Sequence, residues 1–142
     1  QDAVDLLSAG PFAIDHDQRL GLQGQVTIDP AGAWWLSGTV RYDSGLVSNP
    51  SDPAEVAADP DFFDLLPYVD LGADTPRVRP RTIVDVAAGL DLKDGRGRRT
   101  WSAQVQATNL TNRTALYNFQ SVFVGTRLVA PRSLSVRLSR NF

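Results

Sequence analysis

Hydrophobic and polar residues alternate in five separate segments of the chain, which are residues 20–28, 34–42, 84–92, 101–108 and 133–139. A period of two places the apolar side chains on one face of an extended strand and the polar side chains on the other. Trp101 and Ala103, for example, stand on either side of Ser102. The pattern predicts an all-β fold, an antiparallel up-and-down meander of about five strands.

The connections between these segments are alternately short and long. The stretches "DPAGA" and "KDGRGR" have the composition of tight hairpin turns. Residues 47–77 and 112–128 are longer than the roughly 12–15 residues that connections in compact domains usually reach. Outer-membrane barrels combine short periplasmic turns with long extracellular loops. The five strands are therefore predicted to be a segment of a transmembrane β-barrel, with long extracellular loops and short periplasmic turns.

On this interpretation the whole chain, residues 1–142, is one C-terminal barrel segment. Its predicted parts, in order, are an extracellular loop (1–17), a hairpin (18–46), a long acidic extracellular loop (47–77), a second hairpin (78–111), an extracellular loop (112–128) and the C-terminal strand (129–142).

Aromatic residues on the apolar lines give a second indication. If the chain ends in the periplasm, Trp34, Trp101 and Phe142 all fall at the periplasmic ends of their strands, and Tyr42 falls at the opposite end. Barrels carry aromatic girdles at both membrane interfaces. We expect these four residues to form the girdles.

Alternation alone does not decide what covers the apolar face, because a soluble sheet above a core shows the same pattern. The alternative is a soluble β-sandwich or small-barrel module that binds a ligand with its long loops. An enzyme on a β scaffold is a third possibility, yet no converging set of acid, base and nucleophile is visible. We expect no catalytic residues and no enzymatic activity.

Composition narrows the chemistry further. The chain has no Cys, one histidine (His16) and a formal charge of −2. Thiol catalysis, disulfides and Cys-ligated zinc are excluded, and neither a metal site, a cofactor nor a nucleic-acid partner is expected. The sequence also lacks Met and a signal peptide, so we expect it to begin within a longer gene product.

The loop between the second and third segments is strongly acidic. Eight of the 16 acidic residues lie between Asp43 and Pro76, where there is no Lys or Arg. Clustered carboxylates can hold Ca²⁺ or attract a cationic ligand, although the spacing does not match an EF-hand. The candidate substrate-loop residues are Asp59, Asp61, Asp64, Tyr68 and Asp70. The alternative is a solvated loop with a short hydrophobic clasp, formed by Phe62, Phe63, Leu65 and Leu66.

The C-terminal part of the chain, "QVQATNLTNRTALYNFQSVFVGTRLVAPRSLSVRLSRNF", resembles the end of a TonB-dependent outer-membrane receptor. In that family an Asn-Leu segment closes the penultimate strand, and a Gly followed by Pro-Arg leads into a last strand that ends in Phe. The matching residues here are Asn109 and Leu110, Gly125, Pro131 and Arg132, and Phe142. The segment "IDHDQRLGLQGQV" is similar to the start of a barrel strand in the family, so the resemblance covers roughly residues 14–142.

The resemblance implies a large transmembrane β-barrel in the bacterial outer membrane and the import of a scarce nutrient: a siderophore, a vitamin or a saccharide. It implies four partners: outer-membrane lipid, the remaining barrel strands with their plug domain, the barrel-assembly machinery, and TonB through an N-terminal part that this chain lacks. The polar lines of the strands would face the lumen. The barrel-assembly signal would be Leu134, Val136, Leu138 and Phe142, whereas Arg140 departs from it, because an apolar residue is usual there.

Overall fold

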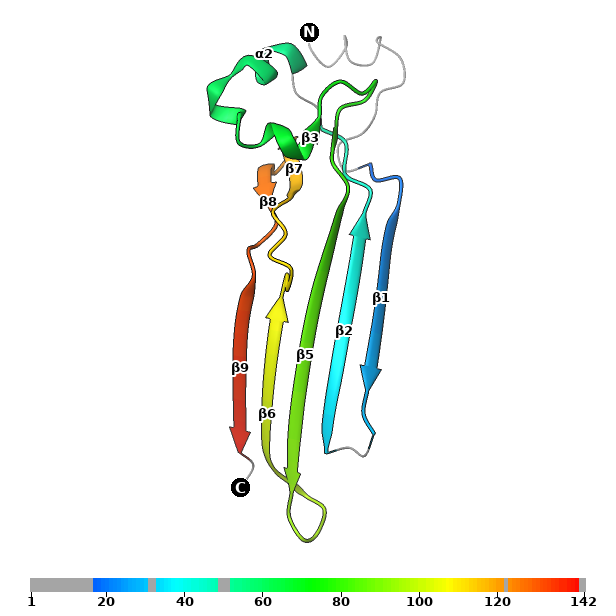
Figure 1. Ribbon diagram of the computed structural model, residues 1–142, viewed down its shortest axis with the longest axis vertical. Coiled ribbons are helices and arrows are strands. Elements are labelled where there is room, and N and C mark those ends of the chain that lie inside the picture. Colours follow the sequence, from blue (N-terminus) through cyan, green and yellow to red (C-terminus); the bar gives the residue numbers. More distant parts are fainter. Residues whose placement is uncertain (1–16, 31–32, 49–51, 122, 141–142) are drawn as a thin grey trace. The chain divides into compact units, whose positions relative to one another are not determined.

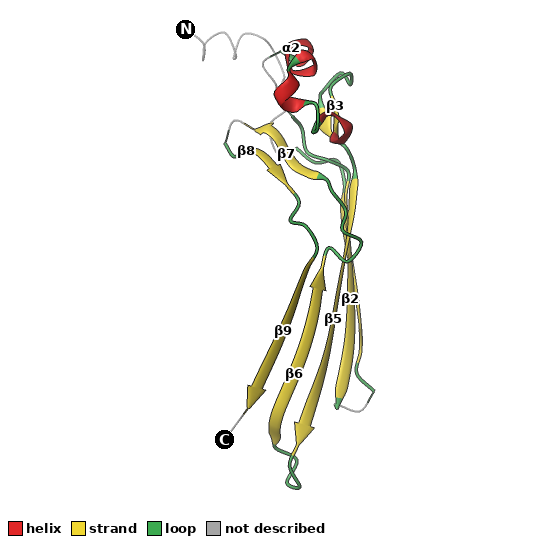
Figure 2. Cartoon of the chain, turned by 60° about the vertical axis from the view of Figure 1, so that its left-hand side comes forward, coloured by secondary structure: helices red, strands yellow, loops and turns green. Residues whose placement is uncertain are grey.

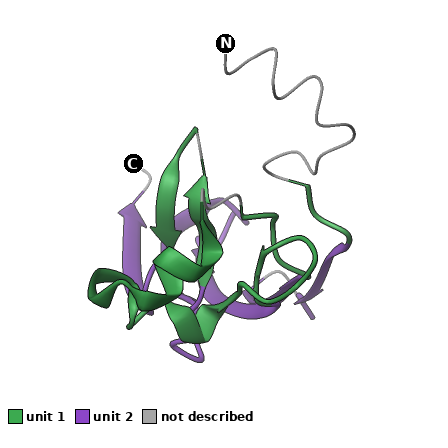
Figure 3. Cartoon of the chain, turned by 90° about the horizontal axis from the view of Figure 1, so that it is seen from above, with its two compact units in different colours: residues 1–19, 44–79, 116–128 green, residues 20–43, 80–115, 129–142 purple. Residues whose placement is uncertain are grey.

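The chain divides into two compact units, each assembled from three stretches of sequence (Figure 3). The computed structural model describes residues 17–30, 33–48, 52–121 and 123–140. Unit 1 contains residues 1–19, 44–79 and 116–128, and unit 2 contains residues 20–43, 80–115 and 129–142.

Unit 2 is a five-stranded antiparallel sheet (Figure 1). Its spatial order is β1-β2-β5-β6-β9, which is also the order of these strands along the chain. The bounds are β1 Gly21–Ile28, β2 Trp34–Asp43, β5 Arg81–Lys93, β6 Arg99–Thr108 and β9 Ser133–Arg140. The predicted antiparallel meander of about five strands is confirmed.

The turn between β5 and β6 is held by one carboxylate. Asp94 accepts hydrogen bonds from the backbone N–H groups of Arg96 and Arg98, both at 2.9 Å, and its side chain pairs with the Arg98 guanidinium at 3.1 Å. Gly97 supplies the positive φ of 77° that the turn needs. The backbone N–H of Arg98 is the main cause that lowers the pKa of Asp94 below its usual 3.8.

An asparagine closes the end of β6. Asn109 is buried and adopts a positive φ of 48°. Its Nδ2 donates to the carbonyls of Arg113 (3.0 Å) and Ala130 (2.9 Å), and its Oδ1 accepts from the Arg113 N–H at 2.8 Å. One side chain therefore ties the segment after β6 to the segment before β9.

The two long connections contain regular structure that the sequence interpretation treated as loop (Figure 2). The first forms α2 Pro53–Ala58, the 3₁₀ helices η1 Pro60–Phe62 and η2 Leu66–Tyr68, and the paired strands β3 Val69–Asp70 and β4 Arg77–Val78. The second forms the hairpin of β7 Leu116–Ser121 and β8 Gly125–Leu128. Within the described ranges, no helix has the length and apolar character needed to cross a membrane.

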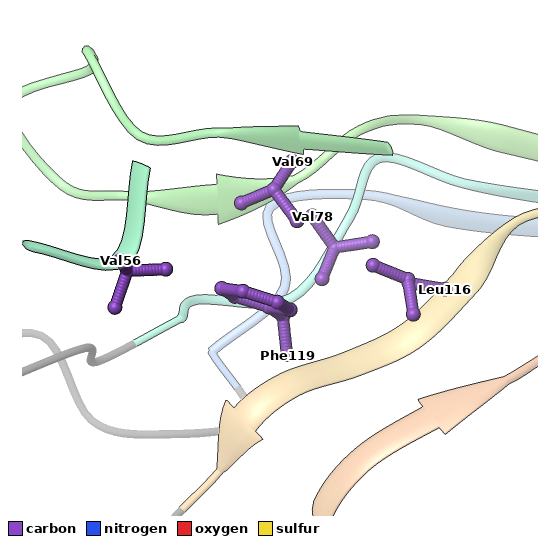
Figure 4. Close-up of a cluster of buried hydrophobic side chains, with 5 residues drawn as sticks. All are labelled: Val56, Val69, Val78, Leu116 and Phe119. Atoms are coloured by element: carbon purple, nitrogen blue, oxygen red, sulfur yellow. The ribbon is translucent and has the colours of Figure 1, made fainter. Parts of the chain in front are cut away.

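These elements share the hydrophobic core of unit 1, which Figure 4 shows. The core brings together buried residues from both long connections: Val56, Val69 and Val78 from the first, and Leu116 and Phe119 from the second. Phe62 packs edge-on against Phe119 with the ring centroids 5.6 Å apart. The buried Ser48 hydroxyl donates to the carbonyl of Phe119 at 2.8 Å. The two connections are therefore parts of one packed body.

Candidate functional site

The register of the sheet aligns the apolar residues of all five strands on one face. One row across the sheet reads Val26, Gly38, Val86, Ala107 and Leu134, each opposite the next. The neighbouring row, on the opposite face, reads Thr27, Ser37, Ala87, Gln106 and Ser135. The alternation within each strand therefore produces one continuous apolar face and one continuous polar face across the sheet.

The apolar face of unit 2 is exposed. Most of its large side chains are between 42% (Leu36) and 71% (Leu134) accessible: Leu22, Val26, Ile28, Trp34, Leu36, Val40, Leu90, Leu92, Trp101, Val105, Leu134, Val136 and Leu138. Tyr42, Val84 and Val86 on the same lines are half-buried. Soluble monomers rarely expose a contiguous apolar patch larger than a few hundred Å². A face of this extent on every strand of a sheet is typical of a surface that meets lipid or another apolar layer.

The predicted aromatic residues lie on this face at defined positions. Trp34 begins β2, Trp101 lies near the start of β6, and each is 46% exposed. Both are next to the short turns that join β1 to β2 and β5 to β6. Tyr42 lies at the far end of β2 and is half-buried. Phe142 lies outside the described residues, so the complete girdles stay a prediction.

Arg140, the residue that departs from the assembly pattern, has an aromatic partner. It lies opposite Trp101 in the pairing of β6 with β9, and its guanidinium carbon is 5.2 Å from the centroid of the indole ring. A cation over an aromatic face is favourable. The other three members of the predicted signal, Leu134, Val136 and Leu138, alternate on the same exposed line of the edge strand β9.

Polar residues on the other face pair with one another across strands. Arg41 on β2 contacts Asp85 on β5 at 2.7 Å, and Asp85 also accepts from the Asn109 N–H at 2.8 Å. Arg99 pairs with Asp91 at 2.8 Å. Ion pairs that remain partly accessible, such as Arg41 with a side chain 40% exposed, fit a surface in contact with water rather than a dry core.

Trp35 is the polar-face residue that sequence reasoning missed. It lies opposite Gly89, where any Cβ would overlap the indole ring. It borders a hollow of about 310 Å³ whose other polar lining residues are Asp29, Asp91, Arg99, Ser102, Gln104 and Arg137. The signal was present in the sequence, because alternation must send Trp34 and Trp35 to opposite faces and Gly89 leaves space for the second indole.

The candidate substrate-loop residues are dispersed within unit 1. Asp59 accepts from the Asp61 N–H at 2.9 Å and caps η1, while Asp61, Asp64 and Asp70 are exposed and Tyr68 packs against the core. Phe62 and Leu65 of the expected clasp also contact the core, but Phe63 is 53% exposed.

Across the described residues, no group of three or more His, Cys, Asp or Glu side chains is placed to hold a metal ion. His16 lies outside the described residues. Substrate binding by this loop stays a prediction.

Comparison with known protein families, curated proteins and solved structures finds no match to this chain.

Proposed function

We propose that this chain is the C-terminal barrel section of an outer-membrane TonB-dependent receptor that imports a scarce nutrient, such as a siderophore, a vitamin or a saccharide. The five strands of unit 2 span the bacterial outer membrane as part of a larger barrel. The chain catalyses no reaction and binds no nucleic acid. The observation that carries the proposal is the apolar face of the sheet, which has exposed large side chains on all five strands.

Strand length and connection length support the same function. The five strands have between 8 and 13 residues, and a tilted membrane-crossing strand needs about 9–11. Short turns join the strand ends near Trp34 and Trp101, whereas long connections leave the other ends. In the proposed orientation the short turns are periplasmic and unit 1 belongs to the extracellular loops.

The partners follow from the two faces and the two edges. The apolar face contacts outer-membrane lipid, and the polar face contacts lumenal water and the plug domain. The outer edges of β1 and β9 pair with the remaining barrel strands, since an open sheet edge is not tolerated in lipid. The barrel-assembly machinery recognises the strand of Leu134, Val136 and Leu138 with Phe142. TonB engages an N-terminal part of the parent protein.

Spin-label accessibility on the last strand tests this function, and no native Cys within these 142 residues competes for the label. Labels would be placed by substitution at Leu134, Val136 and Leu138, and at Ser135 and Arg137 as controls on the opposite face, in the natural full-length protein in liposomes. We expect collisions with oxygen at the first three sites and with a water-soluble nickel chelate at the two controls. If the first three sites are shielded from both reagents, a second protein layer covers the sheet, and a soluble β-sandwich or small-barrel binding module replaces the receptor.

A further inference from the structure

An apolar hollow lies on the exposed face of the sheet at the end that carries Trp101. It has a volume of about 280 Å³ and is lined by Leu90, Leu92, Trp101, Ser102, Ala103 and Leu138. The register explains its position, because Leu92 lies opposite Trp101 and Ala103 lies opposite both Leu90 and Leu138. The small Ala103 side chain leaves a depression between larger neighbours on three strands.

A cation stands beside this hollow. Arg140 follows Leu138 on the same line of β9, and its guanidinium lies over the Trp101 ring at 5.2 Å from the centroid. Of the described residues on the apolar lines of the five strands, Arg140 is the one with a basic side chain. A guanidinium is planar, weakly hydrated and suited to bidentate recognition of phosphate.

We propose that the hollow and Arg140 together form a binding site for one phospholipid. The acyl chain lies along Leu90, Leu92 and Leu138, and the Arg140 guanidinium binds the phosphate of the headgroup. An apolar depression that ends at a cation is complementary to a molecule whose apolar chain ends at an anion. Trp and Arg side chains are both suited to the membrane interface, where an apolar body meets a polar headgroup.

This inference rests on the proposed function, because the site is filled by lipid only if the apolar face meets the membrane. The variant Arg140→Gln gives the comparison, because it removes the cation and leaves Trp101 and the apolar lining in place. Trp34 cannot serve, since it faces Leu90 in the register and therefore adjoins the acyl chain of the bound lipid.

Fluorescence quenching by brominated lipid tests the site. The natural full-length protein in dodecylmaltoside micelles is titrated with a brominated phosphatidylglycerol, and each tryptophan signal is obtained by difference from its Phe variant. We expect quenching of Trp101 to saturate near one lipid per chain at a concentration roughly tenfold below that required in Arg140→Gln, the effect of one charge-assisted contact. Arg137→Gln, on the polar face of the same strand, should leave this concentration unchanged. Brominated diacylglycerol, which has no phosphate, should quench Trp101 alike in the natural protein and in Arg140→Gln.

The outcomes distinguish a failure of the lipid site from a failure of the proposed function on which it rests. If Arg140→Gln leaves the concentration required to quench Trp101 unchanged, or if Arg137→Gln raises it as much, the lipid site is rejected. Brominated dodecylmaltoside then decides the function on which the site rests. If the brominated detergent quenches Trp34 and Trp101 but not Trp35, the apolar face contacts the hydrophobic phase and the proposed function stands. If it quenches none of the three, the barrel assignment itself is rejected.

Discussion

The guanidinium of Arg140 lies over the indole ring of Trp101, 5.2 Å from its centroid and on the apolar face of the sheet. These residues are far apart in the sequence, where Arg140 is a charged residue in a line of otherwise apolar side chains. The pairing of β6 with β9 makes them opposite neighbours. A cation–π contact of about 0.5–1 kcal/mol at an exposed site partly offsets the cost of a charge on that line. The irregularity in the last strand therefore has a local structural partner.

Gly89 is predicted to be required for the indole ring of Trp35 to occupy its observed position. Gly89→Ala places a Cβ into the indole ring, so the ring or the strand must shift. We expect a loss of about 1–3 kcal/mol in the free energy of unfolding, as for other overpacked sites. Urea unfolding followed by tryptophan fluorescence would measure it. Gly38→Ala is the matched control, because nothing lies within 4 Å of its added Cβ. Equal effects of the two variants would show that Trp35 does not occupy this position.

Asn109→Ala should destabilise unit 2 through two separate losses. The substitution removes three hydrogen bonds to backbone groups of Arg113 and Ala130, worth about 0.5–1.5 kcal/mol each. It also places alanine, whose side chain cannot form local hydrogen bonds, at a positive φ of 48°, which is unfavourable for an L-residue. Asn109→Gly suffers the first loss but not the second, since it lacks the three hydrogen bonds but tolerates the positive φ. We expect Gly to lie between Asn and Ala in urea unfolding, and an Ala variant as stable as Asn109 would contradict the assigned role.

The two long connections should lose their order together when their shared core is disrupted. Phe119 is fully buried against Phe62, so Phe119→Ala should cost about 3–5 kcal/mol of packing free energy within unit 1. Limited proteolysis should then cut faster in residues 52–78 as well as in residues 116–128. Phe63→Ala, at a residue 53% exposed, is the control and should leave both rates unchanged. Faster cleavage confined to residues 116–128 would mean that the connections are independent.

The Asp94 turn should respond to acid with a defined sign. Hydrogen bonds from the Arg98 and Arg96 N–H groups lower the pKa of Asp94 in the folded chain below 3.8. A lowered folded pKa gives a stabilisation that is fully present above the unfolded value and is lost as the pH falls through the folded value. Amide exchange at Arg96 and Arg98 should therefore lose protection below about pH 4, beyond the intrinsic pH dependence of exchange. In Asp94→Asn this acid-dependent step should be absent, and a step that persists would assign the titration to another group.

The strands were predictable because their signal is local. Alternation located β1, β2, β6 and β9 to within one or two residues, and it found the centre of β5, which the structure extends to Arg81–Lys93. A period of two needs no knowledge of the partner strand. The two faces of the sheet could be predicted as well, since the antiparallel register places apolar residues opposite apolar residues and polar-line residues opposite polar-line residues.

The helices of the first long connection were missed although their start signals are in the sequence. Asp52 precedes Pro53 and accepts from the N–H groups of Ala54 and Glu55, which is the arrangement of a helix N-cap with proline at the first position. Asp59 and Pro60 repeat it for η1. Asp59 was interpreted as a candidate substrate-loop residue and Asp52 only as part of the acidic loop, and the segments are too short to show helical periodicity.

Contacts between distant segments could not be predicted from the pattern. The stacking of Arg140 on Trp101 and the hydrogen bonds from Asn109 to Ala130 depend on which strands are neighbours and in what register. The shared core of the two connections depends likewise on how they fold back on each other. Each of these contacts becomes visible only when the strand pairing is known.

The most direct test of the central claim uses two consecutive residues, Trp34 and Trp35, which the pleat sends to opposite faces of the sheet. In the natural full-length protein reconstituted into liposomes, the quenching of each by lipids brominated on their acyl chains is obtained from Trp34→Phe and Trp35→Phe variants. A transmembrane barrel section predicts strong quenching of Trp34 and weak quenching of Trp35. If neither tryptophan is quenched, the apolar face does not meet lipid, and this chain is not part of a membrane barrel.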